Sequence, residues 1–95
     1  MRGTEDYKTE EEYEAIFADR IDSMNKLFPM KEHKFALDYA YGGVRLVKRK
    51  NDTGGEADLS TRFYYDEDGT ADYDAFMELL EATTNVLRIV KEQQA

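Results

Sequence analysis

Apolar residues recur every three or four positions in two stretches of the chain and every second position in the stretch between them. In the first stretch the apolar residues share one helical face, and acidic residues mostly fill the others. Thr9 and Glu12 have capping-box spacing and Pro29 is the only proline, so we expect a helix over residues 10–27. Its apolar face consists of Tyr13, Ile16, Phe17, Ile21, Met24, Leu27 and Phe28.

The period changes to two from His33 onward, as expected for strands. We predict strands over residues 33–41, 44–49 and 57–65, with the segment 50–56 as the second turn. The pairs Gly42-Gly43 and Gly54-Gly55 separate these strands and favour tight hairpin turns, because glycine tolerates positive φ. The result is a three-stranded antiparallel meander with one face toward the helices. That face carries Phe35, Leu37, Tyr39, Tyr41, Val44, Leu46, Lys48, Ala57, Leu59, Thr61, Phe63 and Tyr65.

A second amphipathic helix follows the acidic turn "DEDGTADYD", with Thr70 or Asp72 as its N-cap. The order helix, three strands, helix predicts a two-layer α+β fold, with two amphipathic helices over one face of the sheet. The length of 95 residues fits one domain, 1–95, with residues 1–8 as a charged arm. The second helix has an apolar stripe of Tyr73, Phe76, Met77, Leu80, Thr84, Leu87 and Val90.

The composition excludes several classes of chemistry. With no cysteine, the chain has no disulfide, no thiolate metal site and no cysteine nucleophile. His33 is the only histidine, and neither glycine pair matches a phosphate-binding loop. An EF-hand register that starts at Asp66 places Gly69 two positions too early. We therefore expect a protein that is not an enzyme and that needs no metal or cofactor.

The start of the chain has no apolar signal segment, and no apolar run approaches the roughly 20 residues that span a bilayer. We expect a cytoplasmic protein. The net charge of −8 disfavours direct binding to nucleic acid or to an anionic membrane, because the field of the whole molecule repels phosphate.

Two acidic runs are the strongest functional signal. Residues 66–81 contain seven carboxylates and no Lys or Arg, and residues 5–14 contain six carboxylates and one Lys. Such an array can occupy a basic cleft where a partner expects phosphates, so the predicted partner is a basic nucleic-acid-binding protein. The simpler interpretation is a surface that only keeps the protein soluble. The predicted partner-binding residues are Asp66, Glu67, Asp68, Asp72, Asp74 and Glu78.

A second candidate surface is the open face of the sheet. It carries Arg45, Arg49, Arg62 and Tyr64, and we expect Asp38 and Asp58 to pair with the arginines across the strands. Two alternative functions depend on this region. One is an adaptor that pairs with itself, as a homodimer, or with a partner through the sheet. The other is a sponge for nucleotide second messengers, for which Arg45, Arg49 and Arg62 are the candidate ligands.

The stretches "YAYGGVRL" and "GGEADLSTR" resemble a group of small uncharacterised proteins of bacteriophages and mobile elements. The group combines a glycine hairpin, a second glycine turn and an aromatic-bearing helix. The acidic helix, three-strand, helix arrangement is also similar to some anti-CRISPR proteins, in architecture and charge only. Neither resemblance implies an established activity. From the acidic runs, our first hypothesis is a phage-encoded inhibitor that mimics DNA and blocks a host defence nuclease, for instance an RNA-guided one. The residues that match the phage and mobile-element group are Tyr41, Gly42, Gly43, Arg45, Leu46, Gly54, Gly55, Asp58, Ser60, Arg62, Tyr73 and Phe76.

Overall fold

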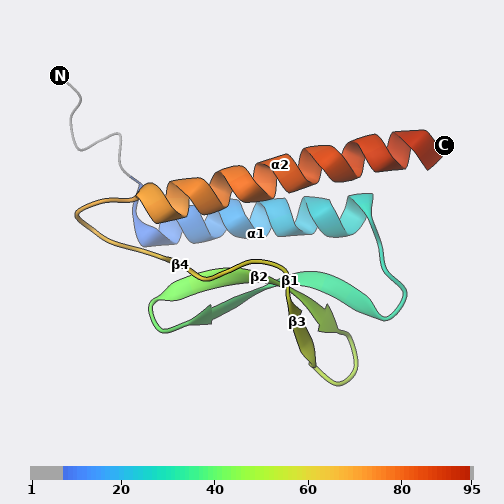
Figure 1. The fold of residues 1–95 in the computed structure, drawn as a ribbon, viewed down its shortest axis with the longest axis horizontal. Helices are drawn as coiled ribbons and strands as arrows, with labels where there is room; N and C mark the ends of the chain where they lie inside the picture. Colours follow the sequence, from blue (N-terminus) through green and yellow to red (C-terminus); the bar gives the residue numbers. More distant parts are fainter. Residues whose placement is uncertain (1–7, 95) are drawn as a thin grey trace.

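The computed structural model describes residues 8–94, so the predicted arm lies outside the described residues except for Lys8. Two helices lie over one face of an antiparallel sheet, which confirms the predicted α+β class (Figure 1). The elements in chain order are α1 (Glu10–Leu27), β1 (His33–Ala40), β2 (Gly43–Lys50), β3 (Glu56–Asp58), β4 (Phe63–Tyr64) and α2 (Ala71–Gln94).

Helix α1 begins and ends where its local sequence predicts. The Glu12 amide donates to Thr9 Oγ1 over 3.1 Å, and the Thr9 amide donates to Glu12 Oε1 over 2.8 Å, which completes the capping box. The helix ends at Leu27, two residues before Pro29. Helix α2 begins directly after Thr70, so Thr70 rather than Asp72 precedes the first helical residue.

Strands β1 and β2 form a hairpin whose register runs from His33 opposite Lys50 to Ala40 opposite Gly43. The turn lies one residue earlier than predicted. Its two central residues are Tyr41 and Gly42, at φ +55° and +76°, and Gly43 belongs to β2. Positive φ at both central residues gives a twist that matches the twist of the strands. The predicted strand end at Tyr41 and the predicted turn role of Gly43 are therefore wrong.

The predicted third strand over residues 57–65 is interrupted. Both β3 and β4 pair with β2, on the side away from β1. From Val47 to Val44 there are three steps along β2, whereas their partners Asp58 and Phe63 are five steps apart. The two extra residues form a bulge. Hydrogen bonds to Leu46 stabilise this bulge. The Leu46 carbonyl accepts from the amides of Leu59 and Ser60, over 2.9 and 3.2 Å. The Leu46 amide donates to the Ser60 hydroxyl over 2.9 Å.

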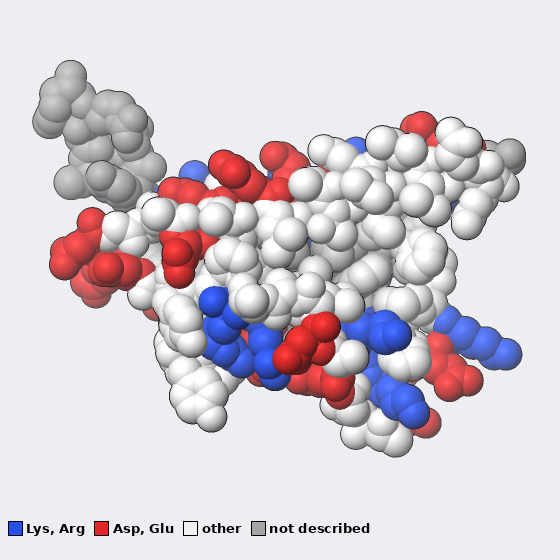
Figure 2. Space-filling model, in the orientation of Figure 1, with Lys and Arg blue, Asp and Glu red and all other residues white. Residues whose placement is uncertain are grey.

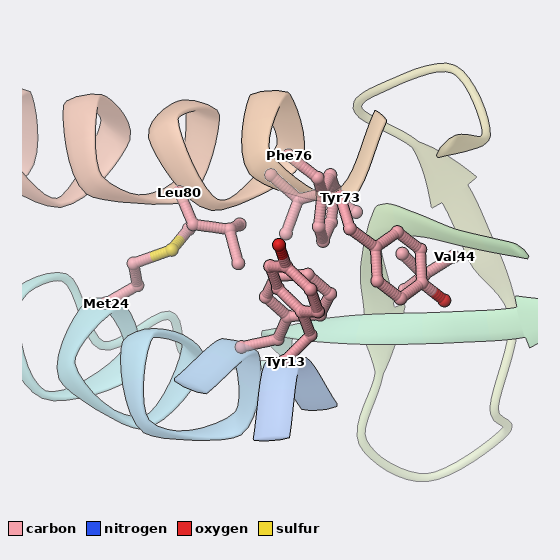
Figure 3. Packing of buried hydrophobic residues seen from close by; sticks show 8 residues of the cluster. Tyr13, Met24, Val44, Tyr73, Phe76 and Leu80 are labelled. Atoms are coloured by element: carbon pink, nitrogen blue, oxygen red, sulfur yellow. The ribbon is translucent and has the colours of Figure 1, made fainter. Parts of the chain in front are cut away.

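The core lies between the two helices and the covered face of the sheet (Figure 3). Aromatic rings form its centre, with Phe17 at 4.9 Å from Phe76 and 5.2 Å from Tyr73 between ring centroids, both edge-on. The two helices run in the same direction, because an odd number of antiparallel passes separates them (Figure 1). The buried cluster contains Tyr13, Phe17, Met24, Val44, Leu46, Tyr73, Phe76 and Leu80.

Gly43 is a point of close approach between β2 and β4. A Cβ atom at this position would lie 2.6 Å from the Phe63 carbonyl oxygen, 2.8 Å from Tyr64 Cδ1 and 2.9 Å from Arg62 Cγ. Only glycine fits there, so this residue is required by packing and not by its φ angle.

The outer edge of β1 is partly protected. The Asn25 side chain of α1 accepts from the Phe35 amide over 2.8 Å and donates to the Phe35 carbonyl over 3.0 Å. In this way a side-chain amide replaces a neighbouring strand at one residue. At the next outward-facing residue, Leu37, the carbonyl accepts from Arg49 Nη2 over 3.3 Å, whereas the backbone groups of Tyr39 have no such partner among the described side chains.

Candidate functional site

The parallel arrangement of the helices brings the two acidic runs together. The Tyr13 hydroxyl of α1 donates to Asp74 Oδ1 of α2 over 2.6 Å, which holds the first turns of both helices side by side. The loop between β4 and α2 leads into the same end of the molecule, and red carboxylates gather there in Figure 2. We call this surface the acidic end. It consists of Glu10, Glu11, Glu12, Asp66, Glu67, Asp68, Asp72 and Asp74.

An open hollow joins the two acidic runs directly. Glu10 and Glu11 of α1 lie on one side, and Tyr65 and Glu67 lie on the other. The hollow has a volume of about 490 Å³ and one basic side chain, Lys8, lines it. Residues more than fifty positions apart in the sequence thus form one negative surface.

Three of the six predicted acids also accept hydrogen bonds from other residues of the fold. Asp66 accepts from the Asp68 amide over 2.9 Å within the loop, and Asp72 accepts from the Tyr64 amide over 3.3 Å. Asp74 accepts from Tyr13 and, over 3.1 Å, from the Thr70 hydroxyl. These bonds fix the loop and the start of α2 against β4 and α1.

The other three predicted acids present free carboxylates. The side chains of Glu67, Asp68 and Glu78 are exposed, and they form no hydrogen bond or ion pair with another residue between 8 and 94. Glu78 lies one turn beyond Asp74 along α2, outside the acidic end. Glu67 and Asp68 are therefore the predicted residues that best combine exposure with a position in the acidic end.

The carboxylates at the first turns repel one another. Burial raises the pKa of Glu14, and the charges of Glu10 and Glu11 raise this pKa further. The same field reaches the aromatic core, where burial and then the charges of Glu10 and Glu14 raise the pKa of Tyr73 to about 12. Repulsion between these carboxylates lowers the free energy of unfolding, and the packing of the core must offset this loss.

The open face of the sheet is paired within itself, as predicted. Arg45 donates to Asp38 and Asp58, over 2.8 Å in each case, and Arg62 donates to Asp38 over 3.0 Å. Arg49 donates from Nε to Glu56 over 2.8 Å. All three candidate arginines are thus bound to carboxylates, and a phosphate would have to displace them.

Tyr64 is half-exposed beside this network and lies opposite Gly43 in the pairing of β2 with β4. Arg62 lies between the network and the backbone, where it also donates to the carbonyl of Asp38 over 2.9 Å. The structure therefore brings Arg45 and Arg62 together at Asp38. Arg49 pairs separately with Glu56.

We expect the network at Asp38 to make stability depend on acid pH. Hydrogen bonds from Arg62, and then the contacts from Arg45, hold the pKa of Asp38 below its usual value. A depressed pKa stabilises the fold above the unfolded value of about 3.9, and this contribution disappears as pH falls through the folded value. The difference in unfolding free energy between the wild type and Asp38→Asn should therefore narrow from pH 7 toward pH 3.

Urea unfolding across this pH range measures the effect. The Arg62→Gln variant removes the principal donor to Asp38, so its difference from the wild type should narrow in the same range. A difference that stays constant from neutral to acid pH would show that Asp38 does not contribute through its charge.

Across residues 8–94, no three His, Asp or Glu side chains are placed to hold a metal ion. In the same part of the chain, neither helix is long and apolar enough to cross a membrane. Comparison with known proteins gave no match to a family model, to a curated protein or to a solved structure.

Glu10 and Glu11 are members of the acidic end that sequence reasoning did not select as site residues. The predicted order of helices and strands already implied that these two residues lie near the second acidic run. Three antiparallel passes of the chain, namely β1, β2, and β3 together with β4, separate the two helices, so the helices run parallel and their N-termini lie at the same end. The acidic first turn of α1 then lies next to that of α2.

Proposed function

We propose that this protein is a non-enzymatic binding protein whose acidic end occupies the basic nucleic-acid-binding cleft of another protein. One observation carries this proposal: two acidic runs that are distant in the sequence line the same hollow, through Glu10, Glu11 and Glu67. In a partner's cleft, Lys and Arg side chains that normally bind phosphates would bind these carboxylates.

The rest of the molecule supports this choice. The net charge of −8 repels nucleic acid, so a protein partner with a basic cleft is the better electrostatic match. Asp66, Asp72 and Asp74 are held by hydrogen bonds to the fold, so part of the array needs no ordering when it binds. A defence nuclease of a bacterial host, RNA-guided or otherwise, is the partner class we propose, with this chain as a phage-encoded inhibitor that mimics DNA.

The test is a set of charge reversals that leaves the internal hydrogen bonds intact. The triple variant Glu11→Lys, Glu67→Lys, Asp68→Lys changes exposed carboxylates of the acidic end. A matched control reverses Asp19, Asp52 and Glu92, which are exposed elsewhere on the chain and change the net charge by the same amount. Circular dichroism should show both proteins folded.

Immobilised protein is incubated with nuclease-treated lysates of bacteria that carry defence systems, at about 0.1 M and about 0.5 M salt. We expect capture of a nucleic-acid-binding protein at the lower salt, its release by short duplex DNA, and loss of capture only in the acidic-end variant. If the control variant lost capture to the same extent, the net charge of the protein, and not the acidic end, would explain binding. Capture that survives both the higher salt and the reversals would exclude the mimic.

The adaptor remains a second candidate because of one observation, the outer edge of β1 at Tyr39, whose backbone groups have no side-chain partner within residues 8–94. A partner strand could add there through backbone hydrogen bonds. Such binding would be insensitive to salt, which separates it from the acidic end in the same experiment. The sponge is disfavoured by the arginine pairs, since Arg45, Arg49 and Arg62 already bind carboxylates.

A further inference from the structure

From Leu79 onward, one flank of helix α2 carries no charged side chain. The residues of this flank recur at spacings of three and four along four turns of the helix, the pattern of a helix that packs against another helix. The charged residues Glu81, Arg88 and Glu92 fall on another flank by the same spacing, and Glu78, four residues before Ala82, lies at the N-terminal border of the uncharged surface. We call this surface the uncharged flank. It consists of Leu79, Ala82, Thr83, Val86, Ile89, Val90 and Gln93.

Helix α1 does not cover the uncharged flank. The contacts from α1 reach the other side of α2, through Tyr13 to Asp74 over 2.6 Å and through Arg20 to Glu81 over 3.6 Å. Val86 and Ile89 are each 57% exposed, which is unusual for two branched apolar residues one turn apart. The buried side of α2 is a third sector, which faces the core, and Leu79 lies at its border and packs partly against the core cluster.

We propose that the uncharged flank is a self-association surface, on which a second copy of this chain packs α2 against α2 in the antiparallel direction. The pair Leu79 and Ile89 and the pair Ala82 and Val86 are both centred on residue 84, so one antiparallel register aligns both pairs. An antiparallel pair therefore brings Leu79 against the partner's Ile89, and Ala82 against the partner's Val86. Each small residue then faces a larger one, which suits close packing of helices.

Charge selects the antiparallel direction. Residues 71–81 of α2 carry four carboxylates and no basic residue, whereas residues 82–94 carry Arg88 and Lys91 against Glu92. The antiparallel arrangement places the acidic half of each helix beside the more basic half of its partner, and it also opposes the helix dipoles. The parallel arrangement would place the two acidic ends side by side, at a cost in repulsion.

The proposed dimer would carry its two acidic ends at opposite extremes of the assembly, so self-association leaves them free. The proposal does not depend on the function of the acidic end. A contact between two helices is small, below about 1,200 Å² of total buried surface, so the dimer should dissociate on dilution.

Sedimentation equilibrium of the full chain over a concentration series, at about 0.5 M salt to screen the net charge, tests the surface. We expect a monomer–dimer equilibrium that Val86→Glu weakens at least about tenfold. Ile89→Glu should act in the same way. Ala18→Glu adds the same charge at an exposed position of α1 and should leave the equilibrium unchanged. Circular dichroism checks that each variant remains folded.

Cysteine pairing tests the direction, because the natural chain has no cysteine. An oxidised mixture of Ala82→Cys and Val86→Cys proteins should form mainly mixed disulfide dimers. A parallel dimer would instead link identical positions. A monomer throughout the series, a dimer that Val86→Glu and Ile89→Glu do not weaken, or linkage of identical positions would each overturn the proposal.

Discussion

Replacing Gly43 by alanine should destabilise the protein by about 3 kcal/mol, because the added methyl group has no space. Its Cβ would lie 2.6 Å from the backbone oxygen of Phe63, and β4 would have to move away from β2. That movement would also disturb Arg62, which bonds to the backbone of β1 through its guanidinium group. Urea unfolding at neutral pH measures the loss.

Gly55→Ala is the matched control. Its Cβ would have one near neighbour, Thr53 Oγ1 at 3.6 Å, which is an ordinary contact, and Gly55 does not have a positive φ. We expect a change within about 0.5 kcal/mol. Equal effects of the two substitutions would mean that β4 adapts to Gly43→Ala and that the contact at Gly43 does not limit the fold.

Replacing Phe17 by alanine should lower the unfolding free energy by about 3–5 kcal/mol, a large share of the roughly 5–15 kcal/mol by which domains of this kind are stable. Phe17 is fully buried, and its ring contacts those of Tyr13, Tyr73 and Phe76. Removal leaves a cavity at the point where both helices meet the sheet. Thermal and urea unfolding followed by circular dichroism would report the loss.

Phe28→Ala removes the same side chain from an exposed site at the end of α1, where Phe28 is 37% exposed. This control should cost less than about 1 kcal/mol. A similar loss at both positions would contradict the central role of the aromatic cluster.

The two charged surfaces differ in how their charges are used. On the sheet, each candidate arginine has an acidic partner, so the surface is electrostatically satisfied without a ligand. At the acidic end, Glu67 and Asp68 have no basic partner between residues 8 and 94, and the neighbouring Glu14 has a raised pKa because of burial and nearby carboxylates. A basic partner would relieve this repulsion, which is why the acidic end carries the proposed function.

Local physical chemistry made a large part of the fold predictable. A capping box needs only Thr9 and Glu12 at the right spacing, and Pro29 ends α1 whatever the rest of the chain does. The period of two over 33–49 predicted β1 and β2, since alternate side chains must meet opposite faces of the sheet. The opposite charges of Asp38 and Arg45, on adjacent strands, predicted their pair.

Tertiary structure decided the features that depend on contacts between distant segments. The bulge between β3 and β4 depends on hydrogen bonds to Leu46, and Gly43 is needed because β4 approaches there. Tyr41 adopts φ +55° because the hairpin register places it in the turn. The sequence by itself determined the helices, the hairpin and the acidic runs, whose causes are local. Only the packed molecule joined Glu10 and Glu67 in one hollow and left the uncharged flank of α2 exposed, because both depend on which faces the helices bury.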